Sequence, residues 1–287
     1  MQVIDETKLD LRRIIAQDFG AAAGTNPEDF INWLHYRARR VPLLPRRVLL
    51  STEVAALRGT YPAISTIQQA LSVGQDVGPW LSNSVRTAKA NHLADRLFNH
   101  WQLSHFHLGA VFVKPGAVSR RRPSSLLFAY ISAEEATLLD VLPHDGQWTR
   151  QHLLEILLRT NPAAMERWRY VGAINGSPLT DGQHENLRAN GGNAAVVIAG
   201  KSFMPALGQT ASGHAARLWL YHNHWDRMVD ALRHDLEANQ VAPHLKPVIF
   251  GRLGVPVRLG AYYEHGGMAI IDRNRNGLVL HQMKPLE

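Results

Sequence analysis

The segment that decides the fold is SHFHLGAVFVKPGAVSRRRPSSLLFAYISAEEATLLDVLPH, which spans residues 104–144. It contains three β-rich runs, HFHLGAVFV, LLFAYI and ATLLDVLPH, whose apolar side chains either alternate with polar ones or form a short block. Turn-forming residues separate these runs, most densely in the loop KPGAVSRRRPSS. The pattern therefore predicts a small antiparallel meander near the middle of the chain.

Helical patterns lie on both sides of the predicted meander. Before it, Asn26-Pro27 followed by two acids begins one expected helix, and apolar residues recur at three-and-four spacing near residues 64–71 and 85–101. After it, TRQHLLEILLRT predicts a helix, and an apolar stripe predicts a longer helix over about residues 212–237. The C-terminal runs VPVRLGAYY, GMAIID and LVLHQM, separated by EHGG and RNRNG, predict β hairpins.

This order of elements predicts the α+β class, because helices and strands are segregated along the chain instead of alternating regularly. We expect a helical region at residues 1–100 and a C-terminal α+β region at residues 166–287, which holds the long helix and the hairpins. Between them, residues 101–165 form the antiparallel meander and the helix after it. This central region is the expected core of an active site.

The composition limits the chemistry that the protein can perform. With 287 residues, of which 45% are hydrophobic, the chain is long enough to bury a sizeable core. It has no cysteine, which excludes disulfides, zinc ribbons, iron–sulfur clusters and thiol nucleophiles. No unbroken apolar run is long enough for a membrane helix or a secretory signal, so we expect a cytoplasmic protein without a membrane partner.

The net charge of +7 and the sequence pI near 9.9 favour a polyanionic partner, and RNA or another nucleic acid is the one that we expect. A basic stretch, RARRVPLLPRR, spans residues 37–47, and its Arg39, Arg40, Arg46 and Arg47 could contact a nucleic-acid backbone. The alternative for Arg39 and Arg40 is that they are cations at a helix C-terminus, where the helix dipole favours positive charge.

Histidines and arginines gather in the decisive segment. His105 and His107 are two residues apart on a predicted strand, so their side chains leave the same face about 7 Å apart at the backbone. His144 and then Asp145 follow at the end of the last predicted strand, and Arg120–Arg122 occupy the loop before the middle strand. Guanidinium groups donate two parallel hydrogen bonds to phosphate oxygens, so this loop is expected to bind nucleic acid.

Imidazoles for proton transfer beside arginines for charge stabilisation are what metal-independent cleavage of RNA requires. The leading hypothesis is therefore a ribonuclease without a cofactor, in which His105 or His107 is the general base and His144 the general acid. Arg121 and Arg122 hold the scissile phosphate. The alternative for the histidine pair is a partly buried structural role, and the alternative for the arginines is a solvated loop.

The segment from about residue 93 to residue 158 resembles the core of RelE-type ribonuclease toxins. In those proteins a helix precedes an antiparallel meander, an arginine-bearing segment leads to a strand like LLFAYI, and the last strand ends in a histidine or a tyrosine. The resemblance implies that Arg121 or Arg122 binds phosphate and that His144 is an acid or a base. It covers under a quarter of the chain, and the pair His105 and His107 is not part of the toxin pattern.

Two other functions fit the same residues. His105, His107, His144 and Asp145 could ligate zinc, iron or manganese in a metal-dependent hydrolase, since imidazole and carboxylate suit these metals. Alternatively, the protein is a non-enzymatic module of a toxin–antitoxin or defence system that binds nucleic acid or a partner protein such as an antitoxin. Sensitivity to a chelator identifies the first function, and salt-dependent binding without turnover identifies the second.

Overall fold

The computed structural model describes most of the chain. The residues that it does not describe are 21–25, 83–84, 86–94, 109–111, 115–116, 119–124, 144–150, 173–176, 191, 206–209, 211–213, 251–253, 265–266 and 284–287. Among the expected site residues, His144 and Arg120–Arg122 lie outside the described residues, as does Asp145.

The chain combines helices with mixed β-sheets, which confirms the α+β class. It forms two compact units: unit 1 comprises residues 1–38 and 218–287, and unit 2 comprises residues 39–217. The two ends of the chain share unit 1 because the first strand pairs with a strand near the C-terminus, Val3 opposite Val257. The three regions expected from the sequence divide the chain at other places.

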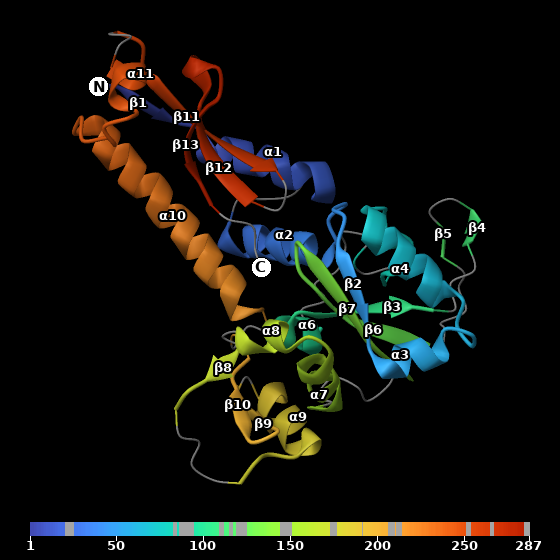
Figure 1. The fold of residues 1–287 in the computed structure, drawn as a ribbon. Coiled ribbons are helices and arrows are strands. Elements are labelled where there is room, and N and C mark those ends of the chain that lie inside the picture. Colours follow the sequence, from blue (N-terminus) through green and yellow to red (C-terminus); the bar gives the residue numbers. More distant parts are fainter. Residues whose placement is uncertain are drawn as a thin grey trace. The chain divides into compact units, whose positions relative to one another are not determined.

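The sheet of unit 1 has four strands in the order β1-β11-β12-β13 (Figure 1). These strands are β1 (Val3–Asp5), β11 (Val257–Glu264), β12 (Gly267–Asp272) and β13 (Leu278–Gln282). β1 runs parallel to β11, whereas β11, β12 and β13 are antiparallel neighbours. The C-terminal hairpins predicted from the sequence are therefore confirmed.

Helices complete unit 1. They are α1 (Thr7–Phe19), α2 (Pro27–Arg39), α10 (Ala216–Glu237), α11 (Lys246–Phe250) and the 3-10 helix η2 (Arg273–Arg275). α10 confirms the predicted long helix and buries an apolar stripe that includes Leu218, Trp225 and Val229. From α2, the ring of Trp33 meets that of Tyr263 on β11 edge to face, with 4.7 Å between the centroids. The core of unit 1 thus joins segments from both ends of the chain.

The main sheet of unit 2 has the order β2-β7-β6-β3. Its strands are β2 (Arg47–Leu50), β3 (Leu103–His107), β6 (Ser125–Ile131) and β7 (Glu135–Pro143). β3, β6 and β7 are antiparallel neighbours, which confirms the predicted meander. β2 is the edge strand of this sheet and runs parallel to β7. Both β1 and β2 lie in the N-terminal region that the sequence pattern predicts to be helical.

The first strand of the meander is shorter than the pattern HFHLGAVFV predicts. β3 ends at His107, and the later part of the run belongs to a separate two-stranded ribbon. This ribbon pairs β4 (Phe112–Lys114) with β5 (Ala117–Val118). The alternating pattern is present in both pieces, so it does not reveal where one strand ends and the next begins.

Apolar side chains cover both faces of the main sheet, because successive residues of a strand point to opposite faces. The helices of unit 2 are α3 (Thr52–Leu57), α4 (Ala63–Val73), η1 (Gly78–Trp80), α6 (Arg96–Trp101), α7 (Gln151–Thr160), α8 (Pro162–Glu166) and α9 (Asp181–Ala189). Phe106 and Leu127 pack in a core with α3 and α4. Leu103 and Phe128 pack in a second core with α6, α7 and α8.

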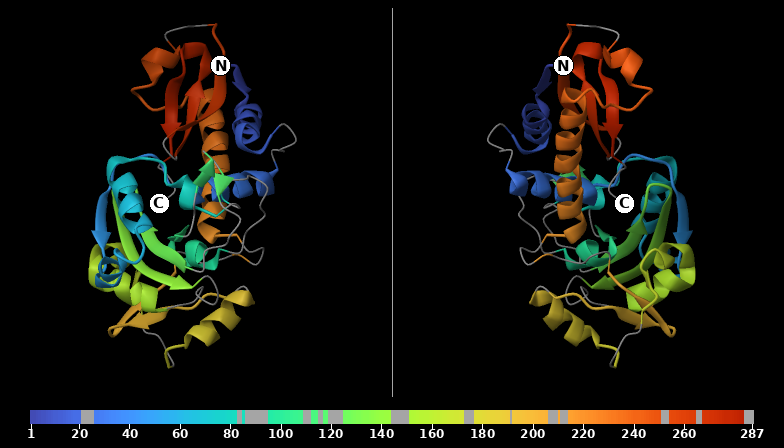
Figure 2. Two further views of the ribbon diagram at one scale, coloured as in Figure 1. Left: turned by 90° about the vertical axis from the view of Figure 1, so that its right-hand side faces the viewer. Right: turned by 90° about the vertical axis from the view of Figure 1, so that its left-hand side faces the viewer.

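A small three-stranded sheet completes unit 2 and has the order β8-β10-β9. Its strands are β8 (Arg169–Tyr170), β9 (Val196–Ile198) and β10 (Lys201–Phe203), and α9 lies beside them (Figure 2). Val196 and Phe203 join the core that contains α7. Within the described ranges, no helix of either unit is both long and apolar enough to cross a lipid bilayer.

Candidate functional site

His105 and His107 lie on the same face of β3, as their spacing predicts. The two imidazole rings are 5.6 Å apart between centroids and meet nearly edge to face, at an interplanar angle of 67°. In the sheet, His105 is opposite Phe128 and His107 is opposite Leu126, and both partners belong to the core with α6 and α7. Only 10% of the His105 side chain is exposed, so the pair lies at the margin of a packed core.

A buried carboxylate lies beside this histidine pair. The Asp95 carboxylate is 3.7 Å from Nδ1 of His105, an ion-pair distance that is longer than a hydrogen bond. Asp95 is the N-cap of α6, where its side chain accepts a hydrogen bond from the N–H of Phe98 at 3.1 Å. It also accepts one at 3.2 Å from Arg39, whose side chain is 9% exposed. One carboxylate thus joins α2, α6 and β3.

Arg217 brings a second, partly buried cation to α6. Its guanidinium lies over the ring of Phe98, 4.9 Å from the centroid, and donates to the carbonyl oxygens of Phe98 at 3.4 Å and Asn99 at 3.3 Å. Burial lowers the pKa of Arg217 to about 10, and the negative charge of Asp95 opposes that shift. The negative charge of Asp95 is therefore balanced by more than one cation.

A hollow lies beside these side chains and is open to solvent. Its empty volume is about 230 Å³, including the open part at its entrance. It is lined by Arg39, Leu81, Ser82, Val85, Asp95, Phe98, Ser104 and His105. Two hydroxyl groups, a guanidinium, a carboxylate and an imidazole therefore converge on one small space. The hollow is below the size of a typical small-molecule pocket, so it suits a single functional group of a larger substrate.

The arrangement can support proton transfer. A carboxylate near Nδ1 favours the imidazole tautomer that carries its proton on Nδ1, which leaves Nε2 of His105 to accept another proton. The same carboxylate stabilises the imidazolium that results.

The expected nucleic-acid contacts at residues 39–47 require a correction. Arg46 is 5% exposed and donates to the carbonyl oxygens of Pro42, Leu44 and Ser132 at 2.7 to 2.9 Å. Burial lowers the pKa of Arg46, and a phosphate outside the molecule has little access to it. Its guanidinium instead satisfies the carbonyls of the proline-rich connector, which a local sequence pattern does not reveal.

The other cations of this stretch differ in exposure. Arg39 is buried and paired with Asp95, so its guanidinium lies at the candidate site and not on the protein surface. Arg40 is exposed, and Arg47 is 68% exposed and paired with Glu135. Among the four arginines expected at residues 39–47, Arg40 and Arg47 are therefore the ones that a nucleic-acid backbone can reach.

The remaining expected residues are His144 and the run Arg120–Arg122, which lie outside the described residues. β7 ends at Pro143, opposite Ser125 of β6, and His107 is opposite Leu126. The described end of β7 therefore lies two strands from His107, at the same end of the sheet. Within the described part of the chain, no three histidine or acidic side chains form a group that could hold a metal ion.

Asp95 and Arg217 are site residues that sequence reasoning missed. Asp95 precedes the run RLFNHW, and an aspartate before a helical run is a recognised N-cap signal. Arg217 carries no comparable signal, since its contacts reach residues 118 and 119 positions away. No protein-family model, curated protein or solved structure matches this chain closely enough to place it in a family.

Proposed function

We propose that the protein is a metal-independent ribonuclease of the toxin or defence type, with His105 and His107 in its catalytic centre. The observation that carries the proposal is the pair of imidazoles on one face of β3, with a buried carboxylate beside one of them at an open hollow. The net charge of +7 and the RelE-like pattern of the central segment add support for RNA as the substrate.

His105 is the proposed general base, because Asp95 favours a proton-accepting Nε2 on this ring. It removes the proton from a ribose 2′-hydroxyl, whose oxygen then attacks the adjacent phosphorus. The bond from phosphorus to the 5′-oxygen breaks, and His144 donates the proton that this leaving oxygen needs. The products are a 2′,3′-cyclic phosphate and a free 5′-hydroxyl, and Arg121 and Arg122 stabilise the charge on the phosphate.

RNA cleavage by the purified protein in the presence of EDTA tests this proposal. His105→Ala and His107→Ala are each expected to lower the cleavage rate by a factor on the order of 10² to 10⁴, the usual contribution of a general acid or base. The triple variant that also carries His144→Ala should neither cleave RNA nor inhibit growth on expression. Analysis of the products should show cyclic phosphate ends.

A matched control is His152→Ala. His152 lies on α7 with its Nε2 atom 3.6 Å from Asp140, so it is also a histidine beside a carboxylate, but 48% of its side chain is exposed. This variant should retain full activity. Full activity of the triple variant would refute the ribonuclease proposal, and loss of activity on adding EDTA would favour the metal-dependent hydrolase instead.

The limited exposure of His105 favours a second candidate, the non-enzymatic binding module. In that case the hollow would receive one group of a nucleic acid or partner protein without chemical change. The expected result is RNA binding whose affinity falls steeply with salt, with no product formed by the wild-type protein.

A further inference from the structure

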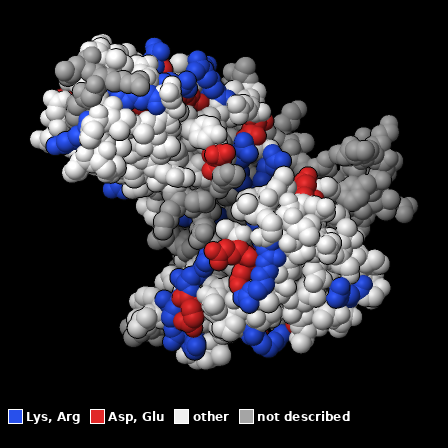
Figure 3. Space-filling view, turned by 45° about the horizontal axis from the view of Figure 1, so that its top comes forward, with Lys and Arg blue, Asp and Glu red and all other residues white. Residues whose placement is uncertain are grey.

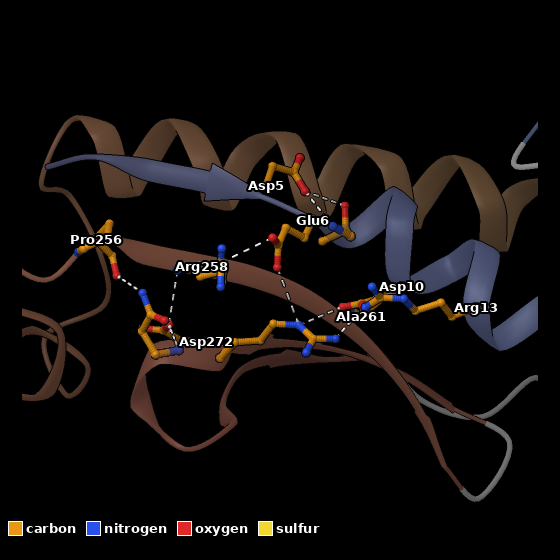
Figure 4. A network of polar contacts seen from close by, with 11 residues as sticks. Asp5, Glu6, Asp10, Arg13, Pro256, Arg258, Ala261 and Asp272 are labelled. Carbon is orange, nitrogen blue, oxygen red and sulfur yellow. Dashed lines mark hydrogen bonds and ion pairs between the residues drawn. The ribbon is translucent and has the colours of Figure 1, made fainter.

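Unit 1 contains a chain of alternating charges that links α1, β11 and η2 (Figure 4). Nε of Arg258 is 3.3 Å from Glu6, and Nε of Arg273 is 3.9 Å from the same carboxylate. Arg273 also donates hydrogen bonds through two of its nitrogens to both carboxylate oxygens of Asp10. A terminal nitrogen of Arg13 lies 3.3 Å from one of these oxygens. We call Arg13, Arg273 and Arg258 the arginine ladder.

The acids of this network point inward, and the arginines point outward. The side chains of Asp10 and Glu6 are 3% and 25% exposed, whereas those of Arg13, Arg258 and Arg273 are 62%, 45% and 38% exposed. Asp10 is held inside because it accepts the backbone N–H of Ala261 at 3.0 Å, where β1 has ended and no longer pairs with β11. The solvent-exposed charge of this network is therefore mainly positive.

The ladder crosses the sheet at a glycine. A Cβ atom on Gly260 would lie 2.7 Å from both Nε of Arg273 and a carboxylate oxygen of Asp10, so a side chain here would displace one of these groups from its position. Arg258 and Tyr262 are each two residues from Gly260 and thus project from the same face of β11. Tyr262 is 49% exposed, so an exposed aromatic residue lies on the same face of β11 as Arg258.

α1 carries further exposed cations. Lys8 and Arg12 of α1 are exposed near Arg13 in the sequence. On the face drawn in Figure 3, Lys and Arg atoms gather over unit 1 with few acidic atoms among them. Each guanidinium carries five N–H donors, and within the described residues the ladder uses at most two nitrogens of any one arginine.

We infer that this face of unit 1 binds single-stranded RNA, with the arginine ladder on successive phosphates and one base stacked on Tyr262. Phosphate oxygens suit exposed guanidiniums, and an exposed ring beside them is the arrangement that binds unpaired bases without sequence preference. A duplex does not offer such a base, since its bases are stacked inside. The choice of RNA as the nucleic acid rests on the proposed function.

Fluorescence anisotropy with a labelled 2′-O-methyl oligouridylate tests the inference, because this RNA has no free 2′-hydroxyl and stays intact. With the full-length chain, Tyr262→Ala should raise Kd about tenfold, the usual effect of losing one stacked base, whereas Tyr262→Phe should keep the parent affinity. The double variant Arg13→Gln with Arg258→Gln should lower the slope of log Kd against log salt by about 2.

Arg233→Gln is the matched control, because Arg233 of α10 is 46% exposed and pairs with a single carboxylate, much like Arg258. It should leave the affinity unchanged. Circular dichroism checks that each variant is folded, and Tyr262→Gln replaces Tyr262→Ala if the latter unfolds.

Equal affinity of the parent and the folded Tyr262→Ala or Tyr262→Gln variant overturns the inference, as does equal affinity for duplex RNA. Dependence on the arginines without dependence on Tyr262 marks a general polyanion surface and also overturns it. The outcome is separable from that of the proposed ribonuclease: cleavage with no effect of these variants defeats this inference alone, and Tyr262-dependent binding without cleavage defeats the ribonuclease alone.

Discussion

The Nδ1 atom of His105 lies 3.7 Å from a carboxylate oxygen of Asp95, and neither side chain has more than 10% of its surface exposed. Asp95 also caps α6 and pairs with Arg39, so the imidazole is held next to a charge that the fold itself needs. Any change at Asp95 is therefore expected to affect the stability of unit 2 as well as the charge next to His105.

Asp95→Asn is expected to lower the free energy of unfolding by about 3–5 kcal/mol, because it leaves the buried guanidinium of Arg39 without its counter-charge. Asparagine is a good N-cap, so the hydrogen bond from Phe98 should survive and the start of α6 should be kept. Urea unfolding measures the change. Asp230→Asn, which breaks the exposed pair with Arg233, should cost less than about 1 kcal/mol, and equal losses in the two variants would contradict the argument.

Gly260→Ala is expected to destabilise unit 1 by about 1–3 kcal/mol, because its methyl group would displace Asp10 and Arg273 from their close contact with the strand. Gly182→Ala is the opposite case. Gly182 lies in α9 with no atom within 4 Å of the added methyl group, so alanine should stabilise the protein by about 0.5–1 kcal/mol. The prediction fails if the two substitutions shift the melting temperature in the same direction.

A buried imidazole predicts a dependence of stability on pH. His184 of α9 has no exposed surface, and in the described part of the chain neither ring nitrogen has a hydrogen-bond partner. Burial, followed by the charge of Arg188, lowers the pKa of His184 below its ordinary value of 6.5. The unfolded chain therefore binds a proton as the pH falls through about 6.5, while the folded protein does not until a lower pH.

The free energy of unfolding should consequently decrease as the pH falls from about 7 toward 5. His184→Leu should make this slope shallower, because it removes the proton-binding group from both states. Some slope should remain, since burial also lowers the pKa of His281. Urea unfolding at several pH values provides the measurement, with the exposed His234→Gln as control; an unchanged slope for His184→Leu counts against the assignment.

Arg275→Met is expected to lower the free energy of unfolding by about 3–5 kcal/mol, because it leaves the buried Asp272 without its counter-charge. The side chains of Arg275 and Asp272 are 2% and 0% exposed, and their closest atoms are 2.5 Å apart. Arg275 also donates to the carbonyl oxygens of Val248 at 3.2 Å and Ile249 at 2.7 Å. Arg275→Lys should recover only part of the loss, since an ammonium group lacks the planar fork that reaches Asp272 and the carbonyl oxygens together.

Chemical unfolding of Arg275→Met and Arg275→Lys, monitored by tryptophan fluorescence, measures both losses. Arg233→Met is the control, because it removes an exposed arginine from the same unit and should have an effect below about 1 kcal/mol. A lysine variant as stable as the parent would show that the charge alone, and not the fork, holds Asp272.

Local sequence patterns predict most elements of this fold. α2 begins where Asn26 and Pro27 indicate, and the side chain of Asn26 accepts the N–H of Asp29 at 2.8 Å. The strands β6 and β7 match the β-rich runs that predict them, because an amphipathic period arises wherever a strand or helix has one buried face. The strands β1 and β2 escape prediction, since three or four residues are too few to show a period and their partners are far along the chain.

The candidate site also has features that the sequence predicts and features that it does not. The shared face of His105 and His107 follows from a period of two along the strand, so the sequence alone is enough to predict it. The carboxylate beside them is not predictable, because Asp95 and Arg39 are 56 residues apart in the chain and meet only in the folded unit 2. The burial of Arg46 likewise depends on carbonyls that the fold brings to it.

By itself, the amino-acid sequence determined the α+β class, the central meander and the common face of the two histidines, because these depend on residues a few positions apart. The tertiary structure alone decided that both chain ends share one unit, which arginines are buried, and that Asp95 neighbours His105. Such contacts join distant segments, and they form only when apolar faces leave water together, which no local pattern records.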